Sequence, residues 1–395
     1  VRDVRSLVKC IKIILERDGD TLQTMPFTST GYVRRDCKQS LKVKPLCWEI
    51  RDMKPGIEVY KMLRMAFRGG NTHASRFYAN KILEDLNSAD ISSSYPYEIV
   101  NGLFPVTKFT IVKCDSQDHL EELIYTKKKA VLIRCKLRNV TLKDDLVPVP
   151  YISTSKCVGI IGGAYDNGRV LSADSIELFS MTDIDYQIIK KQYNFDIEIL
   201  TVATARYGKL PVALRECVLD YFKQKTTLKD KATDQEHTAE FYKLLYNKFK
   251  KLLNAQYGMM AQDPVKIMIK FMEGKEDLFE PEDAEPEVLL NDYNKHAFLA
   301  YQWGVYVCAR ARMHLQQGID LCGPYFVYCD TDSCKYIGDS VDWDKINDAV
   351  RKEAKRNGTF ASDENGNIHY MGLFEKEDHI KRFKTMGAKK YAYEH

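Results

Sequence analysis

The stretch that decides the fold is YFVYCDTDSCKYI, residues 325–337. Two short aromatic and apolar runs, 325–328 and 334–337, stand on either side of Asp330-Thr331-Asp332. Such runs around a tight polar turn predict a β-hairpin that carries Asp330 and Asp332 at one edge of a sheet. An acid-x-acid pair arises by chance roughly eight times in a chain of this composition, so its position between two strands is what makes it informative. The absence of a glycine at the sixth position argues against a calcium-binding loop.

A third carboxylate, Asp90, ends another strand-like segment far earlier in the chain. Carboxylates gathered at one sheet edge repel each other by about 4 kcal/mol per close pair at an effective dielectric constant near 20. Divalent cations relieve that repulsion, and two Mg²⁺ ions roughly 4 Å apart suit in-line phosphoryl transfer. The alternative is that these acids only cap turns, which is the commoner role of any one such residue.

Length and composition limit the class of protein. The 395 residues are enough for roughly two to three domains, and 45% hydrophobic with 29% charged residues excludes a disordered or fibrous chain. The net charge of +4 permits a nucleic-acid partner without arguing for one. The 11 cysteines show no zinc-binding spacing, so we expect reduced thiols in a cytoplasmic protein. No apolar segment is long enough to span a bilayer, and we expect no membrane partner.

Two long helical patterns, 212–229 and 239–257, flank a polar connector and predict an antiparallel helical hairpin. In the second helix Lys250, Asn254 and Tyr257 share one face, which can meet phosphate, sugar and base together. Lys225 and Lys229 lie on the facing helix, so the hairpin can form a cationic funnel for a triphosphate. The alternative is a solvated lysine-rich face, which is more common.

Weaker patterns fill the rest of the chain. Periodic apolar residues predict helices at about 4–17, 76–86 and 297–317, and the runs from 108 to 160 predict a mixed sheet. Eight acids between 273 and 287 predict a surface loop or insertion. The loop Phe67-Arg68-Gly69-Gly70 can let backbone NH groups approach a phosphate, and the basic residues around Phe383 and Tyr391 suit a nucleic-acid backbone. An ordinary turn or a solvated surface also explains each of these features.

Taken in order, four motifs resemble those of family B DNA polymerases, and among them the protein-primed polymerases of phages and linear plasmids. Residues 90–96, DISSSYP, resemble DxxSLYP; residues 250–258, KKLLNAQYG, resemble KxxxNSxYG; residues 328–333, YCDTDS, match YxDTDS; and residues 389–391, KKY, match KxY. Residues 67–70, FRGG, are similar to the YxGG element that joins polymerase and exonuclease domains and touches the template strand. Ser94, Ala255 and Phe67 depart from the usual Leu, Ser and Tyr, and none of these departures removes a metal ligand.

The resemblance implies roles for individual residues. Asp90 and Asp332, with the carbonyl of Ile91, would bind two Mg²⁺ ions, for which Mn²⁺ can substitute, and Asp330 would be a supporting catalytic acid. The incoming nucleotide would be bound by Ser93, Ser94, Tyr95, Lys225, Lys229, Lys250, Asn254 and Tyr257. DNA would be bound by Phe67, Gly69, Gly70, Gly258, Lys389 and Tyr391. The ring of Tyr95 would also lie against the 2′ carbon of the nucleotide, where a ribose hydroxyl would clash.

The implied fold class is α+β, a right-hand polymerase with a palm sheet, helical-hairpin fingers and insertions, and with thumb and exonuclease mostly absent. The implied division is an exonuclease remnant at 1–22, palm at 23–107, an insertion comparable to terminal-protein region 1 at 108–210, fingers at 211–262, an acidic insertion comparable to terminal-protein region 2 at 263–296, and palm at 297–395. The other exonuclease motifs would precede Val1, so we expect no proofreading from these residues.

The implied function is template-directed DNA synthesis in the replication of a viral or linear-plasmid genome, with deoxynucleotides added to a primer 3′-hydroxyl and pyrophosphate released. The partners would be primer-template DNA, deoxynucleoside triphosphates and, if a protein primes synthesis, a terminal protein. Two alternatives stay open at this point. One is an RNA-dependent polymerase or reverse transcriptase, and the other is a catalytically silent DNA-binding protein that keeps the palm.

Overall fold

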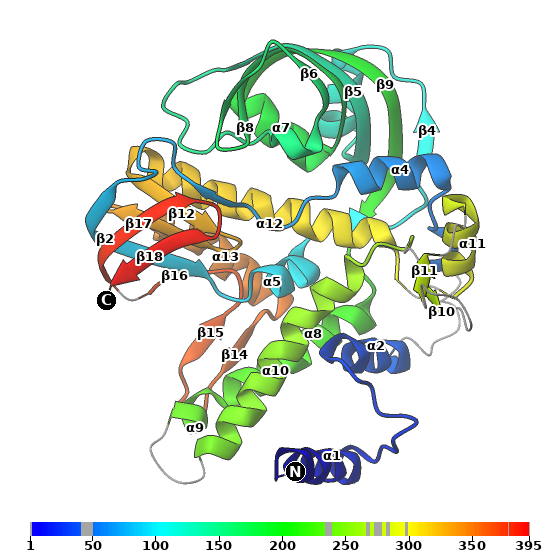
Figure 1. The fold of residues 1–395 in the computed structure, drawn as a ribbon, viewed down its shortest axis with the longest axis vertical. Coiled ribbons are helices and arrows are strands. Elements are labelled where there is room, and N and C mark those ends of the chain that lie inside the picture. The colour runs from blue at the N-terminus through cyan, green and yellow to red at the C-terminus, as the bar shows by residue number, and fades with distance from the viewer. Residues whose placement is uncertain are drawn as a thin grey trace.

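The computed structural model describes residues 2–40, 50–233, 239–265, 269–271, 279–281, 285–296, 299–377 and 379–394. These residues form a mixed helix and sheet fold in which one long helix, α12 (Tyr301–Cys322), separates two antiparallel sheets (Figure 1). A pair of long helices extends away from α12 on the side opposite the second sheet (Figure 1). The α+β class predicted from the sequence is therefore confirmed.

The first sheet carries the hairpin with the two acids. Its strands run in the order β1 (Thr72–Ala74), β12 (Phe326–Asp330), β13 (Ser333–Ile337), β2 (Ile82–Ile91), β17 (Ile380–Gly387) and β18 (Lys390–Glu394), and β16 (Phe374–Lys376) also pairs with β2. The predicted hairpin is thus β12 and β13, and β2 lies directly beside it. This neighbourhood joins segments that are some 240 residues apart in the sequence, with Ser333 opposite Asp90.

The second sheet is formed within residues 104–208. It orders β3 (Phe104–Pro105), β9 (Tyr193–Gly208), β5 (Lys129–Leu142), β8 (Arg169–Thr182) and β6 (Val158–Ile161), with β4 (Thr110–Val112) on β9 and β7 (Ala164–Asp166) on β8. All of these pairings are antiparallel, so the mixed sheet expected here is wrong. Successive strands are joined by turns or by the short helices α6 (Gln117–Glu121) and α7 (Asp183–Gln192), which lets neighbouring strands reverse direction.

The long helix α12 is buried along most of its length because both sheets and the helical hairpin pack on it. Trp303 donates its indole NH to the carbonyl of Pro105 at 2.9 Å, and the hydroxyl of Tyr306 donates to the carbonyl of Val131 at 3.0 Å. These contacts fix the second sheet to the helix. On another face α12 contacts α5 (Ser94–Asn101), which follows directly from β2.

The predicted helical hairpin is confirmed as α8 (Val212–Thr227) and α10 (Ala239–Met260), with the short α9 (Lys229–Thr233) between them. The remaining described elements surround this frame: α1 (Arg2–Asp18), α2 (Ser29–Ser40), α4 (Ile57–Ala66), α11 (Pro286–His296), α13 (Asp344–Asn357), the hairpin β10 (Ile269–Phe271) and β11 (Phe279–Pro281), and the hairpin β14 (Phe360–Ser362) and β15 (Ile368–Tyr370). None of the described helices is both long and apolar enough to cross a bilayer.

Two other expectations, both of helices, were tested by these elements. The helix expected at 4–17 is α1. The helix expected at 76–86 is wrong, because Asn80 and Asp85 take positive φ angles of 67° and 55° and the chain from Ile82 pairs with β13 and β17 as a strand. Most of the acidic segment, at 272–278 and 282–284, lies outside the described residues.

Candidate active site

Two carboxylates meet where the end of β2 lies beside the start of β13. Asp90 is the penultimate residue of β2 and is paired with Ser333, the residue that follows Asp332. The amide of Ile91 donates to the carbonyl of Asp332 at 2.8 Å, which fixes the turn of the hairpin against the end of β2. Strand pairing therefore brings Asp90 and Asp332 to the same edge of the first sheet.

The electrostatics of this edge favour a cation. Burial, the Asp332 carboxylate and the nearby Glu377 and Glu375 raise the pKa of Asp90 to about 8, against an opposing effect of Lys335. Burial and the neighbouring Asp330 raise the pKa of Asp332 to about 6. Each carboxylate is therefore held where its negative charge is costly.

The donor set of this edge fits Mg²⁺. Among the described residues no group of three or more His, Cys, Asp or Glu side chains is arranged to enclose a metal ion. Mg²⁺ is commonly held by one or two carboxylates and completes its shell with substrate phosphates and water, so the Asp90 and Asp332 pair is the kind of donor set it uses. Ile91 follows Asp90 in β2 and is the backbone neighbour of this pair.

Asp330 has a different environment from the other two acids. Its Oδ1 accepts from the hydroxyl of Thr72 at 3.0 Å and from the Nζ of Lys389. The amide of Lys389 in turn donates to the hydroxyl of Tyr328 at 3.0 Å. The structure thus brings Asp330 and Lys389 together beside the carboxylate pair, and the charge of Asp330 is offset by that ammonium group. Tyr391 packs its ring 5.1 Å from that of Tyr328 and stays partly exposed.

The start of α5 faces the helical hairpin. Ser93 precedes the helix in a left-handed conformation, with φ of 51°, and its Oγ accepts from the Nζ of Lys225 on α8 at 3.2 Å. Burial and the nearby Lys250 and Lys229 lower the pKa of Lys225 to about 8. Lys225 thus reaches the first turn of α5, where unpaired backbone NH groups favour an anion, and the charges of Lys229 and Lys250 lie close to Lys225.

The other two lysines differ in their surroundings. Lys250 is exposed on α10, one helical turn before the exposed Asn254. The Nζ of Lys229 lies 3.4 Å from Nδ1 of His369 on β15, so this residue also contacts the β14–β15 hairpin. Ser94, in contrast, is buried, and its hydroxyl has no hydrogen-bond partner within the described residues.

Two tyrosines form a platform between α5 and α10. The rings of Tyr95 and Tyr257 stack with centroids 3.8 Å apart and an interplanar angle of 5°. Both residues are half-buried. Gly258, the next residue of α10, has open space where a Cβ would lie, so packing alone does not require glycine there.

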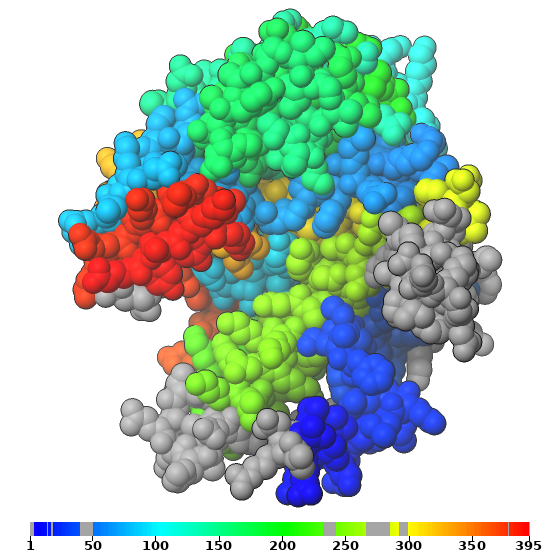
Figure 2. Space-filling model, viewed as in Figure 1, coloured from blue at the N-terminus to red at the C-terminus, as the bar shows by residue number. Residues whose placement is uncertain are grey.

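The glycine loop reaches the same place from another direction. A Cβ on Gly70 would lie 2.7 Å from Cγ2 of Thr331 and 3.0 Å from the hydroxyl of Tyr95, so a larger residue there would displace the side chain of Thr331. Gly69 is exposed with open space around it. Phe67 instead packs beside Tyr301, with ring centroids 6.5 Å apart, so its ring contacts the core. In Figure 2 the cyan surface that includes α5 is visible between the red C-terminal strands and the yellow-green α10.

Several residues of the site were not found from the sequence. Glu375 is paired with Asp90 through β16, Glu377 accepts from Ser88 at 2.7 Å, and Lys335 donates to the same Ser88 hydroxyl at 3.3 Å. These residues belong to no motif. Only two sequence signals could have indicated that these residues face the carboxylate edge. One is the alternation of side chains along β13, and the other is the short run of residues before Ile380.

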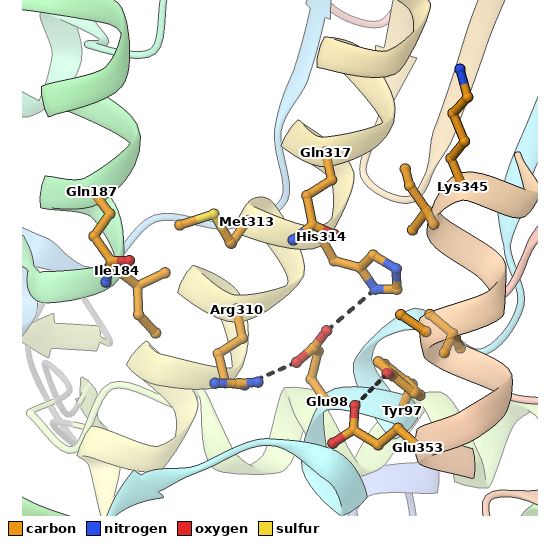
Figure 3. Close-up of a pocket in the computed structure, with 13 residues that line it drawn as sticks. Tyr97, Glu98, Ile184, Gln187, Arg310, Met313, His314, Gln317, Lys345 and Glu353 are labelled. Carbon is orange, nitrogen blue, oxygen red and sulfur yellow. Dashed lines mark hydrogen bonds and ion pairs between the residues drawn. The ribbon is translucent and has the colours of Figure 1, made fainter. Parts of the chain in front are cut away.

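A separate cavity of about 540 Å³ lies between α5, α7, α12 and α13 (Figure 3). Its wall carries Glu98, which is bonded to Arg310 at 2.9 Å and lies 3.3 Å from Nδ1 of His314. Tyr97 donates to Glu353 across the same cavity at 2.9 Å. Among the described residues that line it, none is a site residue predicted from the sequence, so this cavity is distinct from the carboxylate edge.

The comparison with known families decides the assignment. The family described as DNA polymerase type B, organellar and viral, matches residues 44–298, more than half of the chain. The chain belongs to this family. Comparison with curated protein sequences gives no significant match.

Solved structures of a DNA polymerase share the fold of this chain. Phi29 DNA polymerase complexed with primer-template DNA aligns with a TM-score of 0.65 and 17% identity, over 96% of this chain and 56% of that chain. The same enzyme complexed with primer-template DNA and incoming nucleotides aligns with a TM-score of 0.63 and 18% identity, over 96% of this chain and 57% of that chain. The type B chain described here therefore spans little more than half the length of these relatives.

Proposed function

We propose that this chain carries the polymerising centre of a DNA-directed DNA polymerase, which extends a primer 3′-hydroxyl with deoxynucleotides and releases pyrophosphate. The observation that supports this most strongly is the pair Asp90 and Asp332, set side by side on adjacent strands with raised pKa values. A half-buried pair of like charges lowers stability unless a bound cation neutralises it. Membership of the type B family supplies the reaction class.

Mg²⁺ fits the donor groups at this edge. Asp90, Asp332 and the carbonyl of Ile91 would hold two Mg²⁺ or Mn²⁺ ions, which supply the positive charge that activates the primer hydroxyl and neutralises the leaving pyrophosphate. Asp330 supports this arrangement indirectly, because it holds Lys389 beside the pair.

The remaining groups bind and orient the substrates. Lys225, Lys229 and Lys250, with the first turn of α5 at Ser93 and Ser94, bind the triphosphate of the incoming nucleotide. The stack of Tyr95 and Tyr257, with Asn254 one turn before Tyr257 on α10, supports the sugar and base of that nucleotide.

DNA binds on the two sides of the carboxylate edge. Lys389 and Tyr391 contact the primer end. The loop formed by residues 67–70 contacts the template, and so does Gly258. Gly70 lies close to Thr331 and Tyr95, which supports a template contact of this loop beside the carboxylate edge.

The two alternative functions can be compared with the residues of this site. An RNA-dependent polymerase that adds ribonucleotides gains nothing from a tyrosine ring beside the sugar. A reverse transcriptase also adds deoxynucleotides, so only its use of an RNA template distinguishes it from the proposed enzyme. A catalytically silent DNA-binding protein would gain stability by losing one of the two repelling acids. Both acids are present, which favours the DNA polymerase.

We also propose that the chain works in the cytoplasm of a host cell during replication of a viral or plasmid genome, with a terminal protein as primer. The described cysteines are free, as expected for a reducing compartment. On this proposal, residues 108–210 and 263–296 contact DNA or the terminal protein, 211–262 are the fingers, and 23–107 and 297–395 form the palm. Deletion of 274–295 should then shorten the products or reduce protein-primed initiation, while distributive addition to short primers persists.

The deciding experiment is primer extension by the chain and by Asp332→Asn, with Asp339→Asn as control. Asp339 is exposed beyond β13 and accepts from Asn87 at 2.9 Å. We expect Asp332→Asn to lose on the order of 10³-fold in incorporation while its DNA affinity stays within about twofold. Normal extension by Asp332→Asn contradicts the proposed site. A preference for ribonucleotides or RNA templates supports the RNA-dependent alternative, and DNA binding without extension by the unmutated chain supports the silent one.

A further inference from the structure

The β14–β15 hairpin contacts the end of the helical hairpin where α9 connects α8 to α10 (Figure 1). β14 packs against α8, and two pairs of side chains join the β14–β15 hairpin to α9. Nζ of Lys229 lies 3.4 Å from Nδ1 of His369, and Lys231 forms an ion pair with Glu364 at 2.6 Å. Lys229 is one of the residues proposed above to bind the triphosphate, so its contact with His369 bears on that role.

His369 is fixed by a carboxylate at the end of the opposite strand. Its Nε2 lies 2.9 Å from Oδ2 of Asp363. Asp363 is buried, and it also accepts from the amide of Asn367 at 2.8 Å and from the side-chain nitrogen of Asn367 at 3.0 Å. Burial opposes ionisation of Asp363, but the hydrogen bonds from His369 and Asn367 prevail and lower its pKa to about 2. The carboxylate is therefore charged and accepts a hydrogen bond from Nε2 of the ring.

This bond decides what the other ring nitrogen of His369 can do. A neutral imidazole carries a single N–H, so a ring that donates Nε2–H to Asp363 leaves Nδ1 as an acceptor. Nδ1 is the atom that faces the ammonium group of Lys229. The three residues therefore form a chain in which a buried carboxylate orients a ring, and the ring presents an acceptor to a cation.

The ammonium group of Lys229 lies where its charge is unfavourable. We call Lys225, Lys229 and Lys250 the lysine group. Burial, Lys250 and Lys229 together lower the pKa of Lys225 to about 8, which shows that these charges repel one another. Repulsion and side-chain entropy both favour turning the exposed Lys229 side chain away into water. The acceptor on His369 opposes both effects.

We propose that His369 is a positioning residue for nucleotide addition, which holds Lys229 within the lysine group for the triphosphate of the incoming nucleotide. The proposal rests on the DNA polymerase function proposed above. It gives the β14–β15 hairpin, which carries no site residue predicted from the sequence, a part in nucleotide binding. An ammonium group has three N–H donors, so Lys229 can bond to His369 and to phosphate oxygens at the same time.

Two substitutions separate the bond to Lys229 from the bond to Asp363. The amide oxygen of His369→Asn can take the place of Nδ1, so this variant keeps an acceptor for Lys229 and loses the bond to Asp363. The amide nitrogen of His369→Gln can reach the place of Nε2, so this variant keeps a donor to Asp363 and loses the acceptor. His369→Ala loses both.

The measurement is steady-state incorporation of one deoxynucleotide, together with the Kd for primer-template DNA. We expect His369→Ala and His369→Gln to raise the KM for the nucleotide by about threefold to tenfold, and His369→Asn to change it by less than about twofold. In all three variants kcat and the Kd for DNA should change by less than about twofold. His379→Ala is the matched control, because His379 is another histidine beside a carboxylate, 3.8 Å from Asp85, and this variant should leave all three constants unchanged.

A double variant tests whether His369 acts through Lys229. Lys229→Ala should raise the KM by at least as much as His369→Ala does, and the double variant should be no worse than Lys229→Ala alone. Effects that multiply in the double variant mean that His369 does not act through Lys229, and they overturn the proposal.

The other outcomes are distinguishable. A normal KM in His369→Gln with a raised KM in His369→Asn means that the ring only supports the turn at Asp363, and the proposal is wrong. Equal losses in kcat, in nucleotide binding and in DNA affinity lead to the same conclusion. If Lys229→Ala leaves the KM unchanged, this inference fails while the polymerase function stands. Absence of incorporation by the unmutated chain overturns both.

Discussion

At the scale of single residues, burial and neighbouring carboxylates make the ionised forms of Asp90 and Asp332 unfavourable. Their folded-state pKa values of about 8 and about 6 lie above the ordinary value of 3.8. Between about pH 4 and pH 8 the folded chain therefore holds protons that the unfolded chain has released. By linkage, the contribution of this pair to stability falls as pH rises through that window. A bound divalent cation reverses the effect, because it stabilises the ionised pair.

This gives a prediction that does not depend on catalysis. In EDTA, the melting temperature should fall from pH 5 to pH 8 by more in the unmutated chain than in Asp332→Asn. Mg²⁺ at about 100 times its dissociation constant should add about 2.7 kcal/mol of stability at pH 8 and much less at pH 5. Differential scanning calorimetry measures both. Equal Mg²⁺ effects at the two pH values, or in the variant, would contradict a cation site at this pair.

A second residue-scale prediction concerns sugar choice. Tyr95 is held by its stack on Tyr257, and its hydroxyl lies next to Gly70, so its ring has little freedom to move away from a ribose. Tyr95→Val should raise the ratio of kcat/KM for ribonucleotides over deoxynucleotides by about tenfold or more, with DNA affinity nearly unchanged. Steady-state incorporation of matched ribo- and deoxynucleotides measures this ratio. If both values fall by one factor, Tyr95 supports the fold and does not select the sugar.

The sequence predicted the position of a residue best where a motif lies at the end of a strand. It predicted that Asp90 and the Asp330–Asp332 turn would share one sheet edge, which the strand pairing confirms. It could not show that Asp330 bonds to Lys389, because that depends on how the turn from β17 to β18 folds back. His369 gave no signal either, since its contacts with Asp363 and Lys229 become visible only when the β14–β15 hairpin folds against α9.

At the scale of elements, the helical hairpin is joined to α5 at one point. Lys225 of α8 donates to Ser93, directly after β2 and before α5, so a change in the position of α8 changes the first turn of α5. Lys250 lies on the facing helix, exposed and close enough to lower the pKa of Lys225. A bound triphosphate between the two helices would therefore relieve repulsion among their lysines and draw them together.

The element-scale prediction follows from this arrangement. Lys250→Ala should raise the KM for the incoming nucleotide by about tenfold or more and change the Kd for DNA by less than about twofold. Lys251→Ala is the matched control, because Lys251 is exposed on the neighbouring face of α10 and should change neither value. Nucleotide titrations and DNA-binding assays separate the two effects. Equal losses in both would place Lys250 in the DNA groove.

Elements could be predicted where periodicity and turn signals agreed, and not where they conflicted. The helices α8 and α10 show a clear apolar stripe, and they were predicted nearly to their ends. Residues 76–86 also show a helical stripe, but Asn80 takes a left-handed turn and strand partners on both sides of β2 override local preference. The short strands β14 to β16 carry too few residues for any period to be visible.

At the scale of the whole molecule, a buried ion pair joins α12 to α7, which follows β8 of the second sheet. Arg312 bonds to Asp185 at the start of α7 and to the hydroxyl of Tyr151 at 2.7 Å, while its other nitrogen holds the carbonyl of Gly69. Both members of the pair are nearly inaccessible, with 3% and 0% of their side chains exposed. The same guanidinium thus links the second sheet, the long helix and the glycine loop beside the carboxylate edge.

Removal of Arg312 should therefore destabilise the whole chain. Arg312→Ala leaves the Asp185 carboxylate buried without its cation, and we expect a loss of roughly 3–5 kcal/mol in the free energy of unfolding at pH 7. The control Arg138→Ala removes a pair with Glu198 whose side chains are 53% and 47% exposed, and should cost less than about 1 kcal/mol. Urea unfolding measures both values.

The pH dependence of that loss identifies its cause. Burial opposes ionisation of Asp185, but Arg312 and Arg68 prevail and lower its pKa to about 2 from the ordinary 3.8. A depressed carboxyl pKa contributes stability above about pH 4, and this contribution disappears as the pH falls toward 2. The difference between Arg312→Ala and the unmutated chain should therefore shrink over that interval, and Asp185→Asn in the Arg312→Ala background should recover much of the loss at pH 7. A difference that is constant with pH would mean that Arg312 acts through its packing and its backbone hydrogen bonds, and that the ion pair does not hold α12 to α7.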